Sequence, residues 1–172
     1  ELRLIIAPRH PKRASDIVIA IRAEGFGYYR RSEGHAFDAS RKDVFLADTV
    51  GEMDKWYARS GICIIGGTFQ DYRGHTPYEP TAYSCALIHG PHVDNFRSEF
   101  DALAASQASQ KCENAQSISQ AILFLKDAAS QEERVKKAQV ILNTGGDREG
   151  DEILELREAI HEMLHRGKGN HP

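Results

Sequence analysis

A chain of 172 residues is long enough for one domain with a hydrophobic core and too short for two full-sized domains. Hydrophobic residues make up 41% and charged residues 27%, which are ordinary proportions for a globular protein and exclude a disordered or fibrous chain. The formal net charge of -3 excludes a strongly basic protein of the kind that neutralises a phosphate backbone, so no nucleic-acid partner is expected.

Three short apolar runs in the first third of the chain predict buried strands, and a polar stretch between two of them predicts a loop. The strands cover residues 2–7, 26–30 and 44–47, and the loop covers residues 32–43. Apolar residues at helical spacing follow Ser15, whose side chain is expected to cap a helix that Gly25 ends. This part of the chain therefore has the order strand, helix, strand, strand.

The middle of the chain continues the alternation of helices and strands. The run Thr49-Val50-Gly51-Glu52 has the form of a capping box, and it predicts a helix whose apolar face contains Met53, Trp56 and Tyr57. The elements that follow are a strand at residues 62–65, a short helix at 78–83, a strand at 86–88 and a helix that begins near Asp94. A loop rich in glycine and polar residues joins Gly67 to Thr76.

After Ala105 the composition shifts towards serine, glutamine and alanine, and helical patterns dominate. The expected elements are a short strand near Cys112 and helices at residues 118–125, 130–142 and 153–164. Ser130 and Glu133 have capping-box spacing at the start of the second helix, and Gly145-Gly146 is expected to end it. Residues 106–172 are therefore expected to form a mostly helical closing segment.

Strands that alternate with helices predict a parallel sheet, because right-handed crossovers place the helices over both of its faces. The expected fold class is therefore α/β, a Rossmann-like parallel sheet with helices on both faces. Residues 1–172 are expected to form a single domain.

The cysteines and the start of the chain bear on its cellular context. Cys63, Cys85 and Cys112 form no CxxC pair, so they are expected to be reduced structural thiols. No apolar run reaches the roughly 20 residues that cross a bilayer and no signal peptide precedes the first strand, so this stretch is expected to be soluble. A strand pattern that begins at Leu2 without an initiator methionine predicts a fragment of a longer protein.

Polar or glycine-rich turns follow four of the predicted strands. They are Pro8-Arg9-His10-Pro11, Asp48-Thr49-Val50-Gly51-Glu52, Gly66-Gly67-Thr68-Phe69 and His89-Gly90-Pro91-His92. Ligands of parallel sheets bind beyond the carboxyl ends of the strands, so these turns are expected to line one crevice for a phosphorylated ligand. Arg9 offers a forked contact to phosphate, and the glycines at 66 and 67 allow close backbone approach. The pattern leaves open a surface arginine and an ordinary turn as alternatives.

Three further polar features have both a functional and a structural interpretation. Glu79, near a helix start, either accepts hydrogen bonds from ribose hydroxyls or stabilises the helix dipole. His75 either donates to a phosphate or lies solvated in its loop. The run from His161 to His165 has the His-Glu-x-x-His form of a zinc protease helix. A metalloprotease would need a third ligand elsewhere, and this helix lies within about seven residues of the chain end and uses Met163 and Leu164 for packing, so no metal is expected.

Five motifs, taken in chain order, resemble one family. They are IAPRHP at residues 6–11, DTVGE at 48–52 with Trp56-Tyr57 behind it, GGTF at 66–69, GHTPYEP at 74–80 and HGPHVDNF at 89–96. The family is that of the 3-deoxy-D-manno-octulosonic acid (Kdo) transferases, which add Kdo to lipid A precursors, and the match covers residues 2–105. The resemblance implies that the chain is the C-terminal, donor-binding half of a glycosyltransferase-B fold, in which two Rossmann-like halves enclose the active site.

The resemblance also implies a ligand, CMP-Kdo, and a set of residues that contact it. These residues lie in the five motifs: Pro8, Arg9, Thr49, Gly51, Gly66, Gly67, Gly74, His75, Glu79 and Asn95. Arg9, His75 and the backbone around Gly67 would lie near the donor's phosphate and sugar. Gly51 and its neighbours would face the cytosine, and Glu79 the ribose hydroxyls.

By the same resemblance, part of the machinery lies outside this chain. The family's general base is a glutamate of the N-terminal half, so no catalytic residue is expected here and the chain alone is expected to be inactive. The lipid A precursor and the membrane would be reached through that absent N-terminal half, at the cytoplasmic face of the bacterial inner membrane. No cofactor is expected.

Two positions depart from the family's usual pattern. Thr76 stands where an asparagine is usual, and Tyr83-Ser84-Cys85-Ala86 occupies a turn that usually contains glycine with a small residue or proline. Two other functions remain open. One is another B-type glycosyltransferase or an epimerase that uses a UDP-sugar. The other is a non-catalytic flavodoxin-like or receiver module, although the first strand ends in Pro8-Arg9 rather than in an acidic cluster for a metal.

Overall fold

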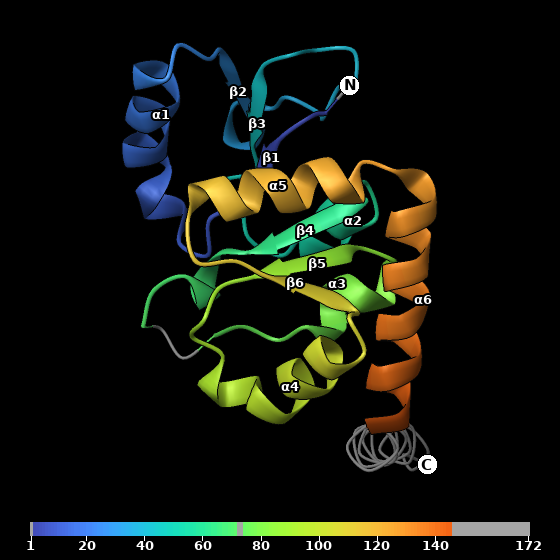
Figure 1. The fold of residues 1–172 in the computed structure, drawn as a ribbon. Coiled ribbons are helices and arrows are strands. Elements are labelled where there is room, and N and C mark those ends of the chain that lie inside the picture. The colour runs from blue at the N-terminus through green and yellow to red at the C-terminus, as the bar shows by residue number, and fades with distance from the viewer. Residues whose placement is uncertain (1, 72–73, 146–172) are drawn as a thin grey trace, which may run out of the picture. The chain divides into compact units, whose positions relative to one another are not determined.

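The structure, a computed structural model, describes residues 2–71 and 74–145 and divides the chain into two compact units (Figure 1). We call Glu1–Ser60 unit 1 and the part from Gly61 onwards unit 2. The helix expected at residues 153–164 and the His161–His165 motif lie outside the described residues. The expectation of one domain over the whole chain stays a prediction.

Unit 1 contains three parallel strands in the order β1-β3-β2. Its elements are β1 (Ile5–Ile6), the 3-10 helix η1 (Pro11–Arg13), α1 (Ala14–Ala23), β2 (Tyr28–Arg30), η2 (Arg31–Glu33), β3 (Val44–Leu46) and α2 (Met53–Tyr57). Leu46 pairs with both Ile6 and Arg30, so the carboxyl ends of the three strands lie at one edge of the sheet. The predicted order of elements is confirmed, and each strand is shorter than the apolar run that predicted it.

Aromatic side chains form the core of unit 1. The centroid of the Phe45 ring lies 4.9 Å from that of Tyr29, 5.1 Å from that of Trp56 and 5.7 Å from that of Phe37. Trp56 is buried as expected, whereas Met53 is 41% exposed. The apolar face predicted for α2 is therefore confirmed only in part.

The N-terminal caps expected in unit 1 are wrong. α1 begins at Ala14, and Ser15 lies inside it. The preceding 3-10 turn supplies a carbonyl partner to the first helical residue, because Ala14 N donates to Pro11 O, and no capping side chain is used. Thr49 donates to the Glu52 carboxylate instead of capping α2. The predicted end of α1 is confirmed, since Gly25 has a φ of 77°.

Unit 2 contains three further parallel strands, in the order β4-β5-β6. Its elements are β4 (Ile62–Ile65), η3 (Gly66–Thr68), α3 (Tyr78–Ala82), β5 (Ala86–His89), η4 (Asp94–Phe96), α4 (Arg97–Ala105), β6 (Ser109–Lys111), α5 (Ala115–Leu125) and α6 (Ala128–Gly145). His89 pairs with both Ile65 and Lys111, which again brings three carboxyl ends to one edge.

Alternate residues of β5 face two hydrophobic clusters, one on each side of the sheet (Figure 1). Leu87 packs in one cluster with Phe100 and Leu103 of α4. Ile88 packs in the other with Ala121 and Leu125 of α5. α6 contributes to both clusters. The predicted α/β fold, parallel strands with helices on both faces, is therefore confirmed, although the strands form two three-stranded sheets rather than one.

One helix cap of unit 2 was not predicted, and another differs from the prediction. Asn114 caps α5, because its side chain accepts from Ser117 N and the Ser117 hydroxyl accepts from Asn114 N. Asp127, not Ser130, serves the start of α6: its carboxylate accepts from both the N and the Oγ of Ser130. Glu133 does not reach back to the helix start. Instead it pairs with Lys137 one turn on, at 2.6 Å.

The three cysteines are free thiols, as expected. Burial raises the pKa of Cys63 to about 12 and the pKa of Cys85 to about 11, so both are protonated at neutral pH. Cys112 is buried in the cluster beneath α5.

Gln107, the second residue after α4, has a backbone conformation that is unfavourable for any residue but glycine. Gln107 has a φ of 54°, and the amides of Gln107 and Ala108 close the helix on the carbonyls of Ala104 and Leu103. Glycine adopts this conformation without the Cβ clash, so Gln107→Gly is expected to raise the free energy of unfolding by about 0.5 to 1 kcal/mol. Urea denaturation followed by circular dichroism measures it. Ser106→Gly, at a negative φ of -95°, is the control and should not stabilise.

Candidate functional site

The expected site residues lie on both units, each in a turn, in a 3-10 helix or at a helix start. Unit 1 carries Pro8, Arg9, Thr49 and Gly51, and unit 2 carries Gly66, Gly67, Gly74, His75, Glu79 and Asn95.

Two turns of unit 1 leave the same edge of its sheet. Pro8-Arg9 follows β1 and Thr49 follows β3, and these two strands are adjacent and parallel. Gly51 has a φ of 77°, a left-handed conformation that favours glycine. The side chain of Arg9 is exposed, while Pro8 and Thr49 are half-buried.

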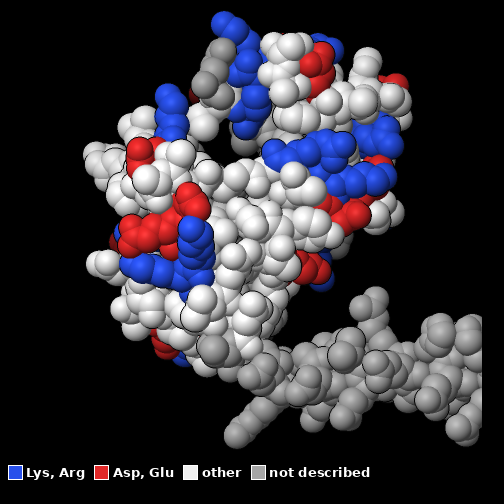
Figure 2. Space-filling view, turned by 90° about the vertical axis from the view of Figure 1, so that its right-hand side faces the viewer, with Lys and Arg blue, Asp and Glu red and all other residues white. Residues whose placement is uncertain are grey.

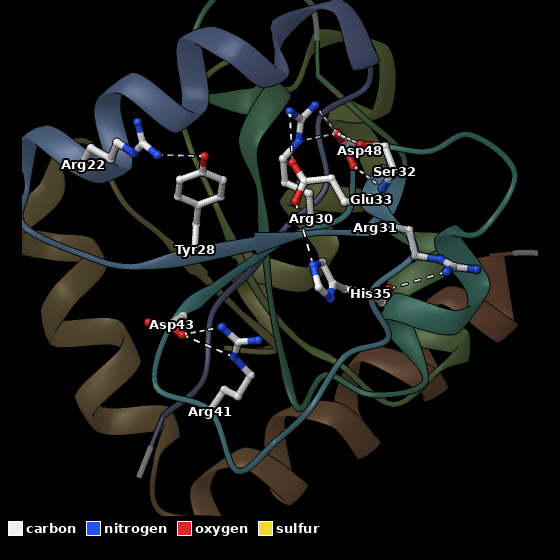
Figure 3. Close-up of polar contacts among 10 residues, drawn as sticks. All are labelled: Arg22, Tyr28, Arg30, Arg31, Ser32, Glu33, His35, Arg41, Asp43 and Asp48. Atoms are coloured by element: carbon white, nitrogen blue, oxygen red, sulfur yellow. Dashed lines mark hydrogen bonds and ion pairs between the residues drawn. The ribbon is translucent and has the colours of Figure 1, made fainter.

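A buried carboxylate, Asp48, ties the end of β3 to the segment after β2 (Figure 3). Its Oδ2 accepts from Arg30 Nη2 at 2.6 Å and from Ser32 Oγ at 2.7 Å, and its Oδ1 accepts from Ser32 N at 2.9 Å. Burial acts to raise the pKa of Asp48, but the hydrogen bonds from Ser32 and Arg30 outweigh it and lower that pKa below its ordinary value. An ionised Asp48 therefore holds the chain just before Thr49.

Glu52 holds the other end of the same turn. Arg31 forms a forked pair with it, with Nε 3.0 Å from Oε2 and Nη2 3.1 Å from Oε1. Lys55 Nζ lies 2.8 Å from Oε1, and Thr49 Oγ1 donates to Oε2 at 2.5 Å. The hydrogen bonds from Arg31, then Lys55 and Thr49, hold the pKa of Glu52 well below its ordinary value. The turn from Asp48 to Glu52 is thus attached at both ends to the segment after β2.

In unit 2, Thr68 has a role similar to that of Asp48 in unit 1, because it joins the turns after β4 and β5. Its side chain is fully buried. Its Oγ1 donates to Ile65 O at 2.6 Å and accepts from Gly90 N at 2.6 Å. Its own carbonyl oxygen accepts from His92 N at 3.0 Å. One residue therefore connects the carboxyl ends of two neighbouring strands.

Two glycines allow the chain segments of unit 2 to approach one another closely. A Cβ at Gly90 would lie 2.3 Å from the Thr68 carbonyl oxygen, so a side chain at this position clashes with backbone. Gly74 has a φ of 86°, and a Cβ there would lie 3.0 Å from His92 O and 3.1 Å from Val93 Cα. The segment that begins at Gly74 therefore rests on the turn after β5.

The imidazole of His75 covers Gly67. A Cβ at Gly67 would lie 2.6 Å from His75 Cδ2. Gly66, Gly67, Gly74 and His75 thus lie together at the carboxyl end of the sheet in unit 2. That they contact a ligand stays a prediction.

His89, the last residue of β5, is buried and fixed by hydrogen bonds at both ring nitrogens. Nδ1 lies 2.8 Å from Gly90 O, which can only accept, so the neutral ring carries its proton there. Nε2 then accepts from Ser109 Oγ at 3.2 Å, and the ring packs 4.4 Å from that of Phe100. Burial lowers the pKa of His89, so it is neutral at physiological pH and supports the Gly90 turn structurally.

Glu79 lies exposed in the first turn of α3, and Asn95 lies exposed in η4. Within the helix that carries Glu79, Thr81 Oγ1 donates to Pro77 O, one turn earlier, at 2.8 Å. Thr76 Oγ1 accepts from Tyr78 N at 3.2 Å just before this helix. At the position where the resembled family usually has asparagine, the hydroxyl of Thr76 therefore accepts a hydrogen bond from the backbone.

Comparisons with known proteins agree with the motifs. No family model matches the chain. It is 38% identical over 106 residues to the 3-deoxy-D-manno-octulosonic acid transferase of Bordetella pertussis, and this covers 61% of the chain and 25% of that protein. It is 31% identical over 169 residues to the enzyme of the same name from Haemophilus influenzae, which covers 95% of the chain and 36% of that protein. The chain thus spans about a quarter to a third of the length of these relatives.

Among solved structures, the chain resembles the crystal structure of the C-terminal CMP-Kdo binding domain of WaaA from Acinetobacter baumannii. The TM-score is 0.73 and the sequence identity 31%, with 82% of this chain and 74% of that chain covered. The chain belongs to the Kdo transferase family. Since the likeness is to a C-terminal domain, this Kdo transferase chain is a C-terminal half of a glycosyltransferase-B fold.

Sequence reasoning found the turns of this Kdo transferase chain but missed their supports. Arg30, Arg31 and Ser32 hold the turn after β3, and the Thr68 hydroxyl holds the turn after β5. The only signal in the sequence is that two arginines lie at the end of a predicted strand, Arg30 as its last residue and Arg31 just after it, and that an acidic residue stands at each end of DTVGE. To pair these arginines with the two acidic residues, one must know the strand order, which the sequence does not show.

The described part of the chain contains neither a cluster of metal-ligating side chains nor a helix that could span a membrane. No group of three or more metal-ligating side chains occurs among residues 2–71 and 74–145. None of the helices within those ranges is long and apolar enough to cross a bilayer. On the face of the Kdo transferase chain in Figure 2, basic and acidic side chains lie beside one another in several places.

Proposed function

We propose that this chain is the donor-binding domain of a Kdo transferase and that it binds CMP-Kdo. The observation that carries the proposal is the likeness, at 31% identity and a TM-score of 0.73, to a domain named for CMP-Kdo binding. The turns at the carboxyl ends of both sheets support it, because such ends are where parallel sheets bind nucleotides.

The phosphate of the donor has three candidate partners. Arg9 is an exposed guanidinium at the end of β1, suited to a forked contact with phosphate oxygens. Gly66 and Gly67 form a 3-10 turn whose backbone a phosphate can approach closely. His75 lies directly over Gly67 and can donate from its ring. Each of these groups is suited to bind the negatively charged phosphate of the donor.

The nucleoside would be held by the remaining expected residues. The turn that contains Thr49 and Gly51 would face the cytosine, with its shape fixed by Asp48 and Glu52. Glu79 would accept hydrogen bonds from the ribose hydroxyls, with Asn95 in the same pocket. Pro8 would restrict the backbone beside Arg9. Gly74 would allow the left-handed conformation and the close approach to His92 that place His75.

The whole protein is proposed to transfer Kdo to a lipid A precursor in lipopolysaccharide biosynthesis. In that reaction a hydroxyl of the acceptor attacks the anomeric carbon of Kdo, and CMP departs. A glutamate of the N-terminal half would accept the hydroxyl proton, so this chain would supply donor binding but no catalytic residue. The acceptor and the cytoplasmic face of the inner membrane would be reached through that half.

Titration of the chain with CMP, followed by 1H–15N NMR, tests the proposal. We expect the amides of Gly51, Gly67, Glu79 and Asn95 to shift, with a dissociation constant on the order of 0.1 to several millimolar, because half of the cleft is absent. UDP should bind more weakly, and an equal response to UDP would favour the UDP-sugar alternative. A spectrum unchanged at several millimolar CMP would contradict the proposal.

A matched pair of arginine variants makes the titration specific. Arg9→Gln is expected to weaken CMP binding by roughly tenfold, as a charge-assisted contact to phosphate is lost. Arg22→Gln is the control, because Arg22 lies near the far end of α1 and its guanidinium stacks on Tyr28. If both variants bind CMP as the unaltered chain does, Arg9 does not contact the phosphate.

A further inference from the structure

The three chain segments at the carboxyl edge of unit 2 form a closed series of contacts. Gly67 lies under His75, the adjoining Gly74 rests on the backbone of His92 and Val93, and His92 N donates to Thr68 O. Thr68 is covalently joined to Gly67, so the series returns to its start. Each segment is thus positioned by the other two.

The Thr68 hydroxyl is the polar side-chain link in this series. It is fully buried and uses both of its hydrogen-bonding roles, as a donor to Ile65 O and as an acceptor from Gly90 N, each at 2.6 Å. The first bond fixes the residue against the end of β4, and the second attaches the turn after β5. A buried N–H that loses its acceptor is costly, so without this oxygen the Gly90 turn is expected to move.

We propose that Thr68 is a positioning residue that couples the Gly66-Gly67 turn to the turn after β5 and so sets the geometry in which the donor's phosphate is bound. The inference rests on the proposed function, since it concerns the same site. Thr68 does not itself face a ligand, because its side chain has no exposed surface. Its effect passes through the backbone of Gly67 on one side and through Gly90 and His92 on the other.

Valine and serine at position 68 separate the hydroxyl from the rest of the side chain. Thr68→Val keeps the shape and removes the oxygen, whereas Thr68→Ser keeps the oxygen and removes a methyl group. The measurement is the CMP dissociation constant of each variant chain by NMR titration. A second readout, without ligand, is the position of the Gly67 amide and His75 imidazole signals.

We expect Thr68→Val to weaken CMP binding by roughly tenfold and to shift the Gly67 and His75 signals, and Thr68→Ser to restore both to within about twofold of the unaltered chain. Val135→Ala is the control, because it removes core volume from α6, which is not one of these three segments. It should lower stability and leave the CMP dissociation constant unchanged, which separates positioning from a general loss of stability.

Each remaining outcome overturns a defined claim. If Thr68→Val binds CMP as the unaltered chain does, the inference fails and the proposed function stands. If Thr68→Ser loses as much affinity as Thr68→Val, the hydroxyl is not the cause and the inference fails. If the unaltered chain does not bind CMP, the proposed function fails and the inference with it. Should Thr68→Val not fold, Thr68→Ala against Thr68→Ser gives the same comparison, since these two differ only in the oxygen.

Discussion

Replacing Gly90 with alanine is expected to cost about 3 kcal/mol or more of unfolding free energy in unit 2. The new Cβ would lie 2.3 Å from Thr68 O, 2.7 Å from Thr68 C and 2.8 Å from Phe69 Cα. All three are backbone atoms, which cannot rotate away as a side chain can. The turns after β4 and β5 would have to separate, and the hydrogen bond from Gly90 N to Thr68 Oγ1 would be lost with that movement.

The same substitution at Gly66 is the control for Gly90→Ala. A Cβ at Gly66 would meet no atom of the described residues within 4 Å, and Gly66 does not have a positive φ. Gly66→Ala should therefore change the unfolding free energy by less than about 1 kcal/mol. Urea denaturation of both variants, followed by far-ultraviolet circular dichroism, gives the comparison. Equal stability of Gly90→Ala and Gly66→Ala would show that the two turns do not pack as closely as the structure has them.

The contrast between these two glycines shows what the sequence could and could not predict. Both follow a strand, and from the sequence each is simply a glycine in a turn. Only the approach of Thr68 to Gly90, 22 residues away, makes one of them irreplaceable. That approach depends on β4 and β5 being neighbours, which the apolar pattern does not state.

Local features were predicted well where the burial of an element decides its pattern of apolar residues. β5 is buried along its whole length and appears in the sequence as a continuous apolar run. α6 buries Val135, Ala138 and Leu142, and their helical spacing predicted it. Its start was misplaced, because Asp127 and Ser130 are both good capping residues and the sequence does not show which one the fold uses.

The ion pairs that hold the turn after β3 could not be predicted either, because they also depend on which strands are neighbours. Asp48 and Arg30 are 18 residues apart, and Glu52 and Arg31 are 21 apart. Neither spacing corresponds to a turn of helix or a hairpin. These pairs form because β2 lies beside β3 and the carboxyl ends of the two strands are level. In this sheet β3 is the central strand, with β2 on one side and β1 on the other.

Loss of the Asp48 charge is expected to destabilise unit 1 by about 2 kcal/mol at neutral pH. Asp48→Asn keeps the size of the side chain but removes the charge that accepts from Arg30 and Ser32, and it turns an amide NH2 towards their donors. Trp56 is the chain's single tryptophan and packs on Phe45 in unit 1, so its fluorescence during urea denaturation reports this loss.

Asp43→Asn provides the matched control, because it makes the same chemical change in an ion pair near the surface. Asp43 and Arg41 are 2.8 Å apart, but their side chains are 37% and 41% exposed (Figure 3). Water replaces most of what such a pair loses, so the expected change is below about 0.5 kcal/mol. If Asp43→Asn costs as much as Asp48→Asn, the burial of Asp48 is not what makes its hydrogen bonds strong.

The difference between Asp48→Asn and the unaltered chain should also depend on pH. Because the pKa of Asp48 is lower in the folded state than its ordinary value of 3.8, the unfolded chain takes up a proton first as the pH falls. The stabilisation from Asp48 is therefore complete above its ordinary pKa and is lost as the pH falls through the lower folded value. We expect the two chains to differ most at pH 7 and to converge in strong acid, whereas a difference that stays constant down to strong acid would mean that the charge of Asp48 contributes nothing.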